Sequence, residues 1–300
     1  MKERVLLFLL LCTFSCANAQ TSNYSFGVKI YGKGKPMLMI PGNNGAGETF
    51  DDLVAHYKAH YKCYVITLAG FAGQPPSSAK SDLLKRQRDE IIRYVSDKHL
   101  QKPVLVGFSF GGVLALWVAT TAPDLFGPII DIDGVPFEAA IENPHINIDS
   151  LRKADQLRYQ RILTASPSYR AKKDSIRRAT EYPDGFHELQ KLESDSVRIM
   201  QILKWDAATD FKSSLLMNVE MDTLDLRKQV SNIRSPILVL GSWQGWDILK
   251  TKAEAEQAYR SQFTNAKRVT IAFSEQGKHF LMYEDLDWLL YQTDKFLVNR

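Results

Sequence analysis

The chain has little cysteine and no long apolar run. Only three of its 300 residues are cysteine, and two of these, Cys12 and Cys16, lie within the first 19 residues. Cys63 is then the only cysteine in the rest of the chain, which excludes an intramolecular disulfide there and a cysteine-based metal site. The longest apolar stretch, residues 5–11, is shorter than the roughly 18 residues that a transmembrane helix needs. We therefore predict no integral membrane segment and no metal.

A strong charge imbalance is also missing. The formal net charge is +4, from 38 Lys and Arg against 34 Asp and Glu, which is too mild to indicate a nucleic-acid or membrane partner. A glycine-rich loop does follow an apolar run, at residues 41–47, but it lacks the Gly-Lys-Ser/Thr ending of a phosphate-binding loop. We therefore expect no cofactor and predict a small-molecule substrate.

The first 19 residues are typical of a secretory signal. Charged residues 2–4 precede the apolar run, and Ala17 and Ala19 meet the small-residue rule for cleavage before Gln20. Cleavage would remove two basic residues and one acidic one, leaving a net charge of +3. Export without disulfides is typical of a bacterial periplasm or of an extracellular location. In a competing interpretation Cys16 is a lipidation site, since residues 13–16 loosely resemble a bacterial lipobox.

The remaining chain predicts one α/β domain with an insertion. An edge strand is expected over the weakly alternating residues 25–31, and further strands are expected where apolar runs occur, at residues 36–40, 64–68, 104–108, 128–133, 235–241 and 267–273. Helical segments separate most of them, as in residues 48–60, 81–100 and 113–121, so we expect right-handed crossovers and a mostly parallel, doubly wound sheet.

The strand pattern is absent between residues 137 and 234. Only helical segments are expected there, at residues 148–163, 169–180, 186–205 and 211–217, with prolines at 144, 167 and 183 between them. We therefore predict a core made of residues 20–136 and 235–300 with a helical cap, residues 137–234, inserted into it.

Ser109 lies between a predicted strand and a predicted helix, in the sequence Gly107-Phe108-Ser109-Phe110-Gly111-Gly112. G-x-S-x-G in this context is a nucleophile elbow, a tight turn that projects the serine oxygen away from the sheet. Gly107 and Gly111 are explained by close passage of strand and helix, which leaves no room for a Cβ. We predict that Ser109 is a catalytic nucleophile.

A serine nucleophile needs a base, and a histidine base needs an acid to orient it. Of the six histidines, His279 alone stands in a loop directly after a predicted core strand. In the chain order Ser, acid, His, the acid follows the strand that ends at residue 240, where Asp247 is the first carboxylate. The alternative acid is Asp133, which ends the strand after the elbow, and Asp131 is a weaker third candidate.

The tetrahedral intermediate of acyl transfer also needs fixed hydrogen-bond donors. We predict an oxyanion hole made of the backbone N–H groups of Asn43, in the loop after residue 40, and Phe110, directly after the nucleophile. Four aromatic residues on predicted loops near the site suggest a substrate pocket for an apolar acyl group, namely Phe71, Phe108, Trp243 and Trp246.

These motifs together resemble the α/β-hydrolase fold superfamily over nearly the whole predicted mature chain, and within it exported bacterial serine hydrolases with a helical cap. The resemblance rests on the loop at residues 40–43, the elbow around Ser109, the cap insertion, and the Gly-Lys-His-Phe sequence at 277–280. Many members have His-Gly where this chain has Pro41-Gly42. Many place the acid three residues after the position of Gly241, where this chain has Gln244.

A serine at the elbow indicates acyl transfer to water rather than chemistry through an aspartyl ester. We therefore expect a carboxylesterase acting on small or medium apolar acyl groups. An amidase or aminopeptidase of the same fold is the alternative, and it would need carboxylates in the cap to hold an amine, for which Glu188, Glu193 and Asp195 are candidates. A relative that binds a ligand without turnover is a third possibility.

Overall fold

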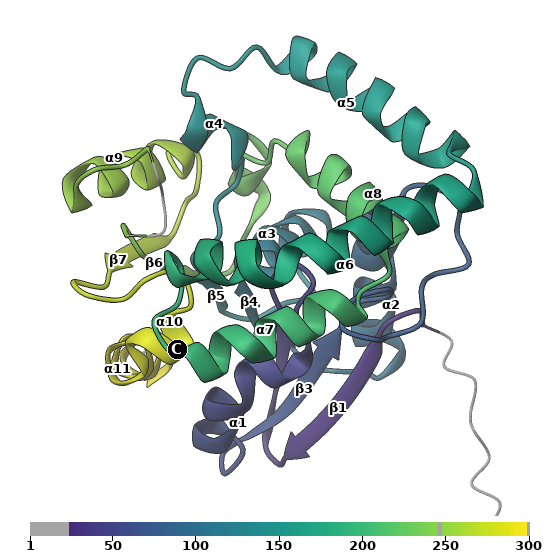
Figure 1. Cartoon of the computed structure of the whole chain (residues 1–300). Coiled ribbons are helices and arrows are strands. Elements are labelled where there is room, and N and C mark those ends of the chain that lie inside the picture. The colour runs from purple at the N-terminus through teal and green to yellow at the C-terminus, as the bar shows by residue number, and fades with distance from the viewer. Residues whose placement is uncertain (1–23, 245–247, 299–300) are drawn as a thin grey trace, which may run out of the picture.

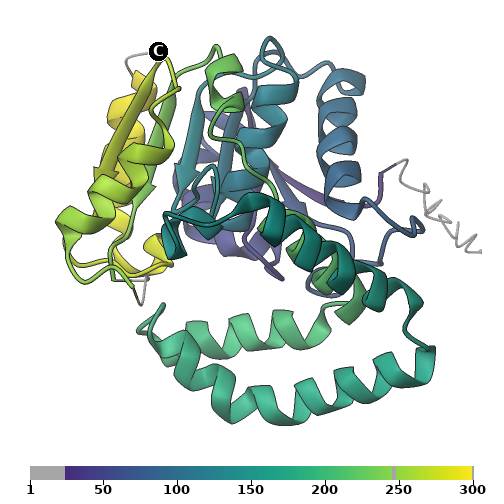
Figure 2. The ribbon, with the colours of Figure 1, turned by 90° about the horizontal axis from the view of Figure 1, so that it is seen from above.

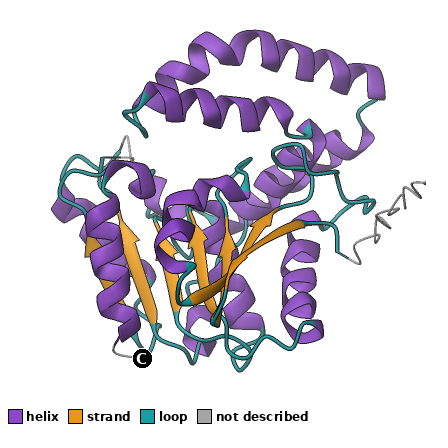
Figure 3. Ribbon diagram, turned by 90° about the horizontal axis from the view of Figure 1, so that it is seen from below, coloured by secondary structure: helices purple, strands orange, loops and turns teal. Residues whose placement is uncertain are grey.

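The computed structural model describes residues 24–244 and 248–298, and in these residues a seven-stranded sheet forms the centre of the fold (Figures 1 and 3). The strands are β1 (Gly27–Gly32), β2 (Lys35–Ile40), β3 (Tyr61–Thr67), β4 (Val104–Phe108), β5 (Ile129–Ile132), β6 (Ile237–Gly241) and β7 (Val269–Phe273). Their order in the sheet is β1-β3-β2-β4-β5-β6-β7, with only β1 antiparallel to its neighbour. The predicted mostly parallel α/β sheet is confirmed.

Helices cover both faces of this sheet. The core helices are η1 (Gly47–Phe50), α1 (Asp51–Tyr57), α2 (Leu83–Asp97), α3 (Phe110–Thr121), α9 (Lys252–Gln262), α10 (Leu281–Glu284) and α11 (Leu286–Val298). Apolar side chains of α2, α3 and α9 pack in one hydrophobic cluster, and those of α1 and α11 pack in another on the opposite face. Central strands buried on both sides explain the unbroken apolar runs of β4 and β6.

The segment between β5 and β6 is helical. It contains α4 (Ala139–Glu142), α5 (Ile148–Thr164), α6 (Pro167–Gln190), α7 (Ser196–Ala208), α8 (Phe211–Asp222) and η2 (Gln229–Asn232). The long helices α6 and α7 run side by side across one end of the sheet (Figures 2 and 3). Their residues face Ser109 across a cavity, so they lie over the end of the sheet from which the elbow projects.

One helix boundary in this segment was predicted wrongly. The sequence predicts a break at Pro183 followed by a helix over 186–205, whereas α6 continues past position 183 to Gln190 and the break falls at residues 191–195. Proline removes one hydrogen bond from a helix but does not have to end it. The new start is set by Asp195, whose side chain caps α7 by accepting from the Val197 N–H.

Candidate active site

Ser109 occupies a strained turn between β4 and α3. Its backbone is left-handed, with φ 52° and ψ −122°, a conformation that non-glycine residues rarely adopt. The turn is held by a hydrogen bond from the Ser109 N–H to the Ile132 carbonyl at 2.7 Å. A Cβ on Gly107 would overlap the Gly111 carbonyl, and one on Gly111 would overlap the Ile40 carbonyl, which explains both glycines. The strand-turn-helix elbow predicted for this stretch is therefore present.

Three side chains from distant parts of the chain form a hydrogen-bonded line at the elbow. His279 Nε2 lies 2.9 Å from Ser109 Oγ, and His279 Nδ1 lies 2.6 Å from Asp133 Oδ2. The rings of Phe108 and His279 are in contact, with centroids 5.0 Å apart. A nucleophile, a base and an orienting acid within hydrogen-bond reach are what acyl transfer through a serine requires.

The acid position opposite His279 is occupied by Asp133, the second of the two candidates. The first candidate, Asp247, lies outside the described residues. Asp133 follows β5 directly and has a left-handed backbone, with φ 55°. Its neighbour Asp131 is completely buried elsewhere, where Oδ1 accepts from the Gly134 N–H at 3.0 Å. Burial raises the pKa of Asp131 well above its usual value.

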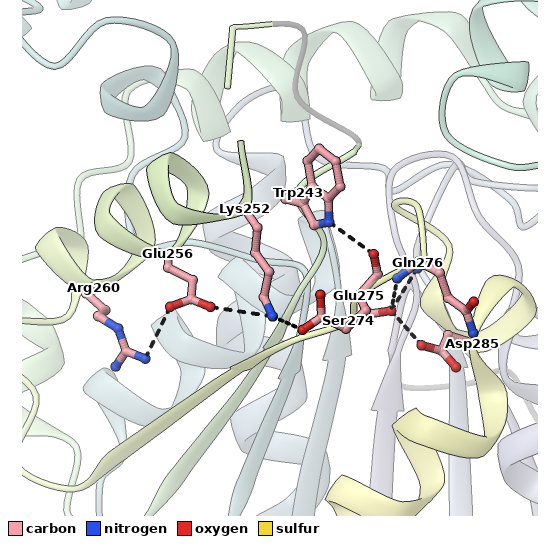
Figure 4. A network of polar contacts seen from close by, with 9 residues as sticks. Trp243, Lys252, Glu256, Arg260, Ser274, Glu275, Gln276 and Asp285 are labelled. Atoms are coloured by element: carbon pink, nitrogen blue, oxygen red, sulfur yellow. Dashed lines mark hydrogen bonds and ion pairs between the residues drawn. The ribbon is translucent and has the colours of Figure 1, made fainter. Parts of the chain in front are cut away.

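The loop that carries His279 is fixed by a buried serine (Figure 4). Ser274 Oγ donates to Asp285 Oδ2 at 2.5 Å and accepts from the Gly277 N–H at 2.7 Å. These bonds connect the end of β7, the turn before the histidine and the start of α11. His279 therefore sits on a braced turn, which limits the rotation of its ring relative to Ser109.

The predicted oxyanion loop lies beside the serine. Asn43 lines the cavity at Ser109, and the loop is closed by a hydrogen bond from the Gly45 N–H to the Gly42 carbonyl at 3.0 Å. Asn44 is left-handed, and its side-chain amide donates to Asp206 of α7. Phe110 is the first residue of α3, where a backbone N–H has no acceptor within the helix. Asn43 thus lies at the cavity and Phe110 follows Ser109 directly, and their role as oxyanion donors stays a prediction.

A cavity of about 350 Å³ opens over Ser109 between the core and the inserted helices. Seven of the side chains that line it are apolar: Phe108 and Phe280 from the core, and Leu189, Leu192, Ile202, Leu203 and Trp205 from the segment between β5 and β6. A smaller cavity of about 150 Å³ lies on the other side of the Ser109–His279 pair and shares Leu192 with the first. No pattern in the sequence singles out these helix residues as lining, because their apolar spacing is equally typical of core packing.

Of the four aromatic residues predicted to line the pocket, Phe108 does so and two do not. Phe71 is fully buried with its ring against Phe110, at a centroid separation of 5.7 Å, and lines neither cavity beside Ser109. Trp243 also lines neither, since its indole N–H donates to the Glu275 carbonyl at 3.3 Å (Figure 4). The rings of Phe71 and Trp243 therefore lie outside the cavity. Trp246 lies outside the described residues.

The three carboxylates considered for an amine site do not converge. Glu188 lines the large cavity and accepts from Lys191 at 2.7 Å. Glu193 is buried beside Glu284 of α10, and Asp195 caps α7. Burial, reinforced by the Glu284 carboxylate, raises the pKa of Glu193 to about 7.

A doubly wound parallel sheet with a serine on a strained elbow and a histidine after the last strand defines the α/β-hydrolase class. The chain belongs to the alpha/beta hydrolase family, whose model matches residues 37–289. The resemblance seen in the sequence is thereby confirmed at the level of family and fold.

Two curated relatives have the same name, pimeloyl-[acyl-carrier protein] methyl ester esterase. The relative from Aeromonas salmonicida is 27% identical over 123 residues, which cover 41% of this chain and 47% of that protein. The relative from Aliivibrio salmonicida is 27% identical over 109 residues, covering 36% and 40%. The match thus spans less than half the length of these relatives.

Solved structures share the fold at low identity. The enol-lactonase from Burkholderia xenovorans has a TM-score of 0.66 at 14% identity and covers 91% of this chain and 96% of its own. A thermophilic esterase from Thermogutta terrifontis has a TM-score of 0.65 at 17% identity and covers 91% and 93%.

Within residues 24–244 and 248–298, no helix has the length and apolar character needed to span a membrane.

Proposed function

We propose that this protein is a serine hydrolase that cleaves carboxylic esters of small or medium apolar acyl groups through an acyl-enzyme. The observation that carries the proposal is the line Ser109 Oγ, His279 Nε2, His279 Nδ1 and Asp133 Oδ2, with separations of 2.9 and 2.6 Å. The esterase names of the curated relatives also support an ester substrate.

In the proposed reaction, His279 Nε2 accepts the proton of Ser109 Oγ as that oxygen attacks the ester carbonyl. The N–H groups of Asn43 and Phe110 stabilise the negative charge on the carbonyl oxygen. The imidazolium then donates its proton to the leaving alkoxide, and the acyl group remains on Ser109. Water, deprotonated by His279, cleaves this ester and releases the carboxylic acid. Asp133 holds the Nδ1–H tautomer throughout and stabilises the imidazolium.

The large cavity supports the proposal that the substrate has an apolar acyl group. It lies directly over Ser109 and next to Asn43, and most of its wall surface is apolar. An aminopeptidase is less well supported, because Glu193 and Asp195 point to other partners and Glu188 is paired with Lys191. The two carboxylates that line the cavity, Glu188 and Asp206, already have partners in Lys191 and Asn44, so they do not form the cluster that an amine would need.

The decisive experiment combines a substrate panel with active-site labelling. The purified protein should hydrolyse p-nitrophenyl acetate and butyrate faster than aminoacyl-p-nitroanilides, and a fluorophosphonate probe should label it once. Ser109→Ala should lose both activities while it keeps the thermal unfolding temperature of the unmodified chain. Equal labelling of Ser109→Ala would refute the nucleophile. Absence of labelling in the unmodified protein would favour a binding protein without turnover.

We also propose that residues 1–19, which lie outside the described residues, direct export. Mass spectrometry of the protein recovered from a bacterial periplasm should find an N-terminus at Gln20. A lipid-modified N-terminus at Cys16 would establish the alternative, and an intact Met1 in the cytoplasm would refute export.

A further inference from the structure

The triad acid itself is held by two residues of the core. Asp133 is 3% exposed and accepts four hydrogen bonds. Oδ1 accepts from the Ser242 N–H at 2.7 Å and the Tyr259 hydroxyl at 2.6 Å, and Oδ2 accepts from the Ser242 hydroxyl at 2.6 Å and from His279 at 2.6 Å. A carboxylate has about four lone-pair positions, so these bonds fill its capacity.

Both residues come from the β6–α9 region. Ser242 follows β6 directly and is completely buried, and Tyr259 is a completely buried residue of α9 whose ring packs edge-on against Phe273 of β7. The helix that carries Tyr259 is tied to the loop before His279, since Lys252 bridges Glu256 on α9 and Glu275 (Figure 4). Asp133, its donors Ser242 and Tyr259, and His279 are therefore connected through the end of β6, helix α9 and the loop before His279.

The structure assigns to Tyr259 and Ser242 the role of positioning residues for the reaction, which hold the Asp133 carboxylate aimed at His279. This inference rests on the proposed triad. Hydrogen bonds donated to a carboxylate favour its charged form, and two donors on Oδ1 leave Oδ2 to face the imidazole. Neither Tyr259 nor Ser242 lines a cavity beside Ser109, so they act through Asp133 and not through substrate contact.

Other titratable groups near Asp133 do not replace these donors. Asp131 of β5 adds only like charge when ionised, and Glu138 lies at the smaller cavity that Asp133 also lines. His279 is the remaining titratable neighbour. Removal of the Tyr259 hydroxyl leaves the negative charge of Asp133 less compensated, which favours the imidazolium form of His279. The acid limb of the kcat/KM profile should therefore move to higher pH.

Tyr259→Phe tests the inference against a matched control, Tyr57→Phe. Tyr57 is also buried and donates to an aspartate, Asp294, but it lies on α1, away from the site. With p-nitrophenyl butyrate, Tyr259→Phe should lower kcat about tenfold, leave KM nearly unchanged and move the acid limb up by about half a pH unit. Ser242→Ala should act in the same direction, and it serves as the test if Tyr259→Phe is unstable. Tyr57→Phe should change none of these.

An activity-independent measurement separates this inference from the proposed function. The titration of the His279 ring, followed by NMR, should move upward in Tyr259→Phe and Ser242→Ala relative to Tyr57→Phe, whether or not any ester is hydrolysed. This shift in a protein without esterase activity would refute the ester function and keep the positioning role. Unchanged ring titration and an unchanged acid limb in both variants would overturn the inference.

Discussion

At the scale of single residues, the main question is which aspartate is the acid of the proposed triad. Asp133 and Asp247 both follow strands at the same edge of the sheet, but only Asp133 is described, 2.6 Å from His279. The left-handed backbone at Asp133 turns its side chain toward the histidine, while Asp131, two residues earlier, is buried elsewhere. The backbone conformation thus separates two carboxylates that are only two positions apart at the end of β5.

Asp133→Asn should lower kcat by roughly three to four orders of magnitude, because an amide cannot hold the Nδ1–H tautomer of His279. Asp247→Asn is the matched control, with the same change in the other candidate, and should keep near-normal kcat. Both are measured by steady-state hydrolysis of p-nitrophenyl butyrate. The reverse pattern would return the role to Asp247.

At the scale of elements, the end of α6 and the turn that leads to α7 are joined to the segment on both sides of His279. The Phe280 N–H donates to the Leu192 carbonyl at 3.3 Å, Lys278 donates to the Gln190 carbonyl at 2.7 Å, and Ser194 donates to Glu284 of α10. Since Leu192 lines both cavities, these hydrogen bonds also help to fix the shape of the space around Ser109.

Glu193 lies in the turn between α6 and α7, and its titration makes the stability of the folded protein depend on pH. Its pKa in the folded protein is raised to about 7 by burial and by Glu284, above an ordinary value near 4.5, so the folded state binds the extra proton. The free energy of unfolding should fall as pH rises from about 4.5 to 7 and then level off, by on the order of 1–3 kcal/mol from this group. Glu193→Gln should flatten that fall.

Urea denaturation at pH 5, 6, 7 and 8 measures this effect. Asp195→Asn, at the neighbouring helix cap, is a suitable comparison because it also removes one carboxylate from the same turn. An identical slope in the unmodified protein and in Glu193→Gln would contradict the prediction.

The C-terminal end of α7 contacts the loop that carries the proposed oxyanion donor Asn43. Asp206 accepts from the side chain of Asn44, and the Thr209 hydroxyl donates to the Asn44 carbonyl at 3.4 Å. Asp206→Ala should loosen the loop next to Asn43 and reduce kcat about tenfold, with a smaller rise in KM. Lys204→Ala on the same helix should leave both constants unchanged. A change confined to KM would mean that Asp206 contacts substrate without positioning the loop.

At the scale of the whole molecule, the large cavity exists only where the two parts of the chain meet. The core contributes Ser109, Asn43 and Phe280, and the inserted helices contribute most of the apolar wall. Acyl-chain preference should therefore depend on the inserted helices, while the chemistry depends on the core.

Ile202→Trp should fill part of the cavity. We expect kcat/KM for p-nitrophenyl hexanoate to fall about tenfold relative to the acetate, because removal of room for one or two methylenes changes specificity by that order. Val197→Trp, a highly exposed position on the same helix, is the control and should leave the chain-length profile unchanged. An equal loss for all esters in Ile202→Trp would indicate damage to the fold and not a change in the pocket.

The sequence alone was sufficient for the seven strands and the elbow, because each depends on local patterns: unbroken apolar runs and glycines where backbones touch. His279 was selected by its place after the last strand, and its role as the base stays a prediction. Pocket residues were predicted poorly. Phe71 and Trp243 stand on loops beside the site, but an aromatic ring packs wherever it removes most apolar surface from water, and here that is away from the cavity.

What only the tertiary structure decided is which carboxylate meets His279 and what holds it there. Strands β5 and β6 are hydrogen-bonded neighbours, with Ile132 paired to Leu240, so the loops after both begin at the same edge of the sheet. Because the two loops start side by side, position in the chain does not predict which of their carboxylates contacts His279. In the described residues Asp133 meets His279, and its other donors Ser242 and Tyr259 lie 109 and 126 residues further along, so this arrangement depends on contacts between residues far apart in the sequence.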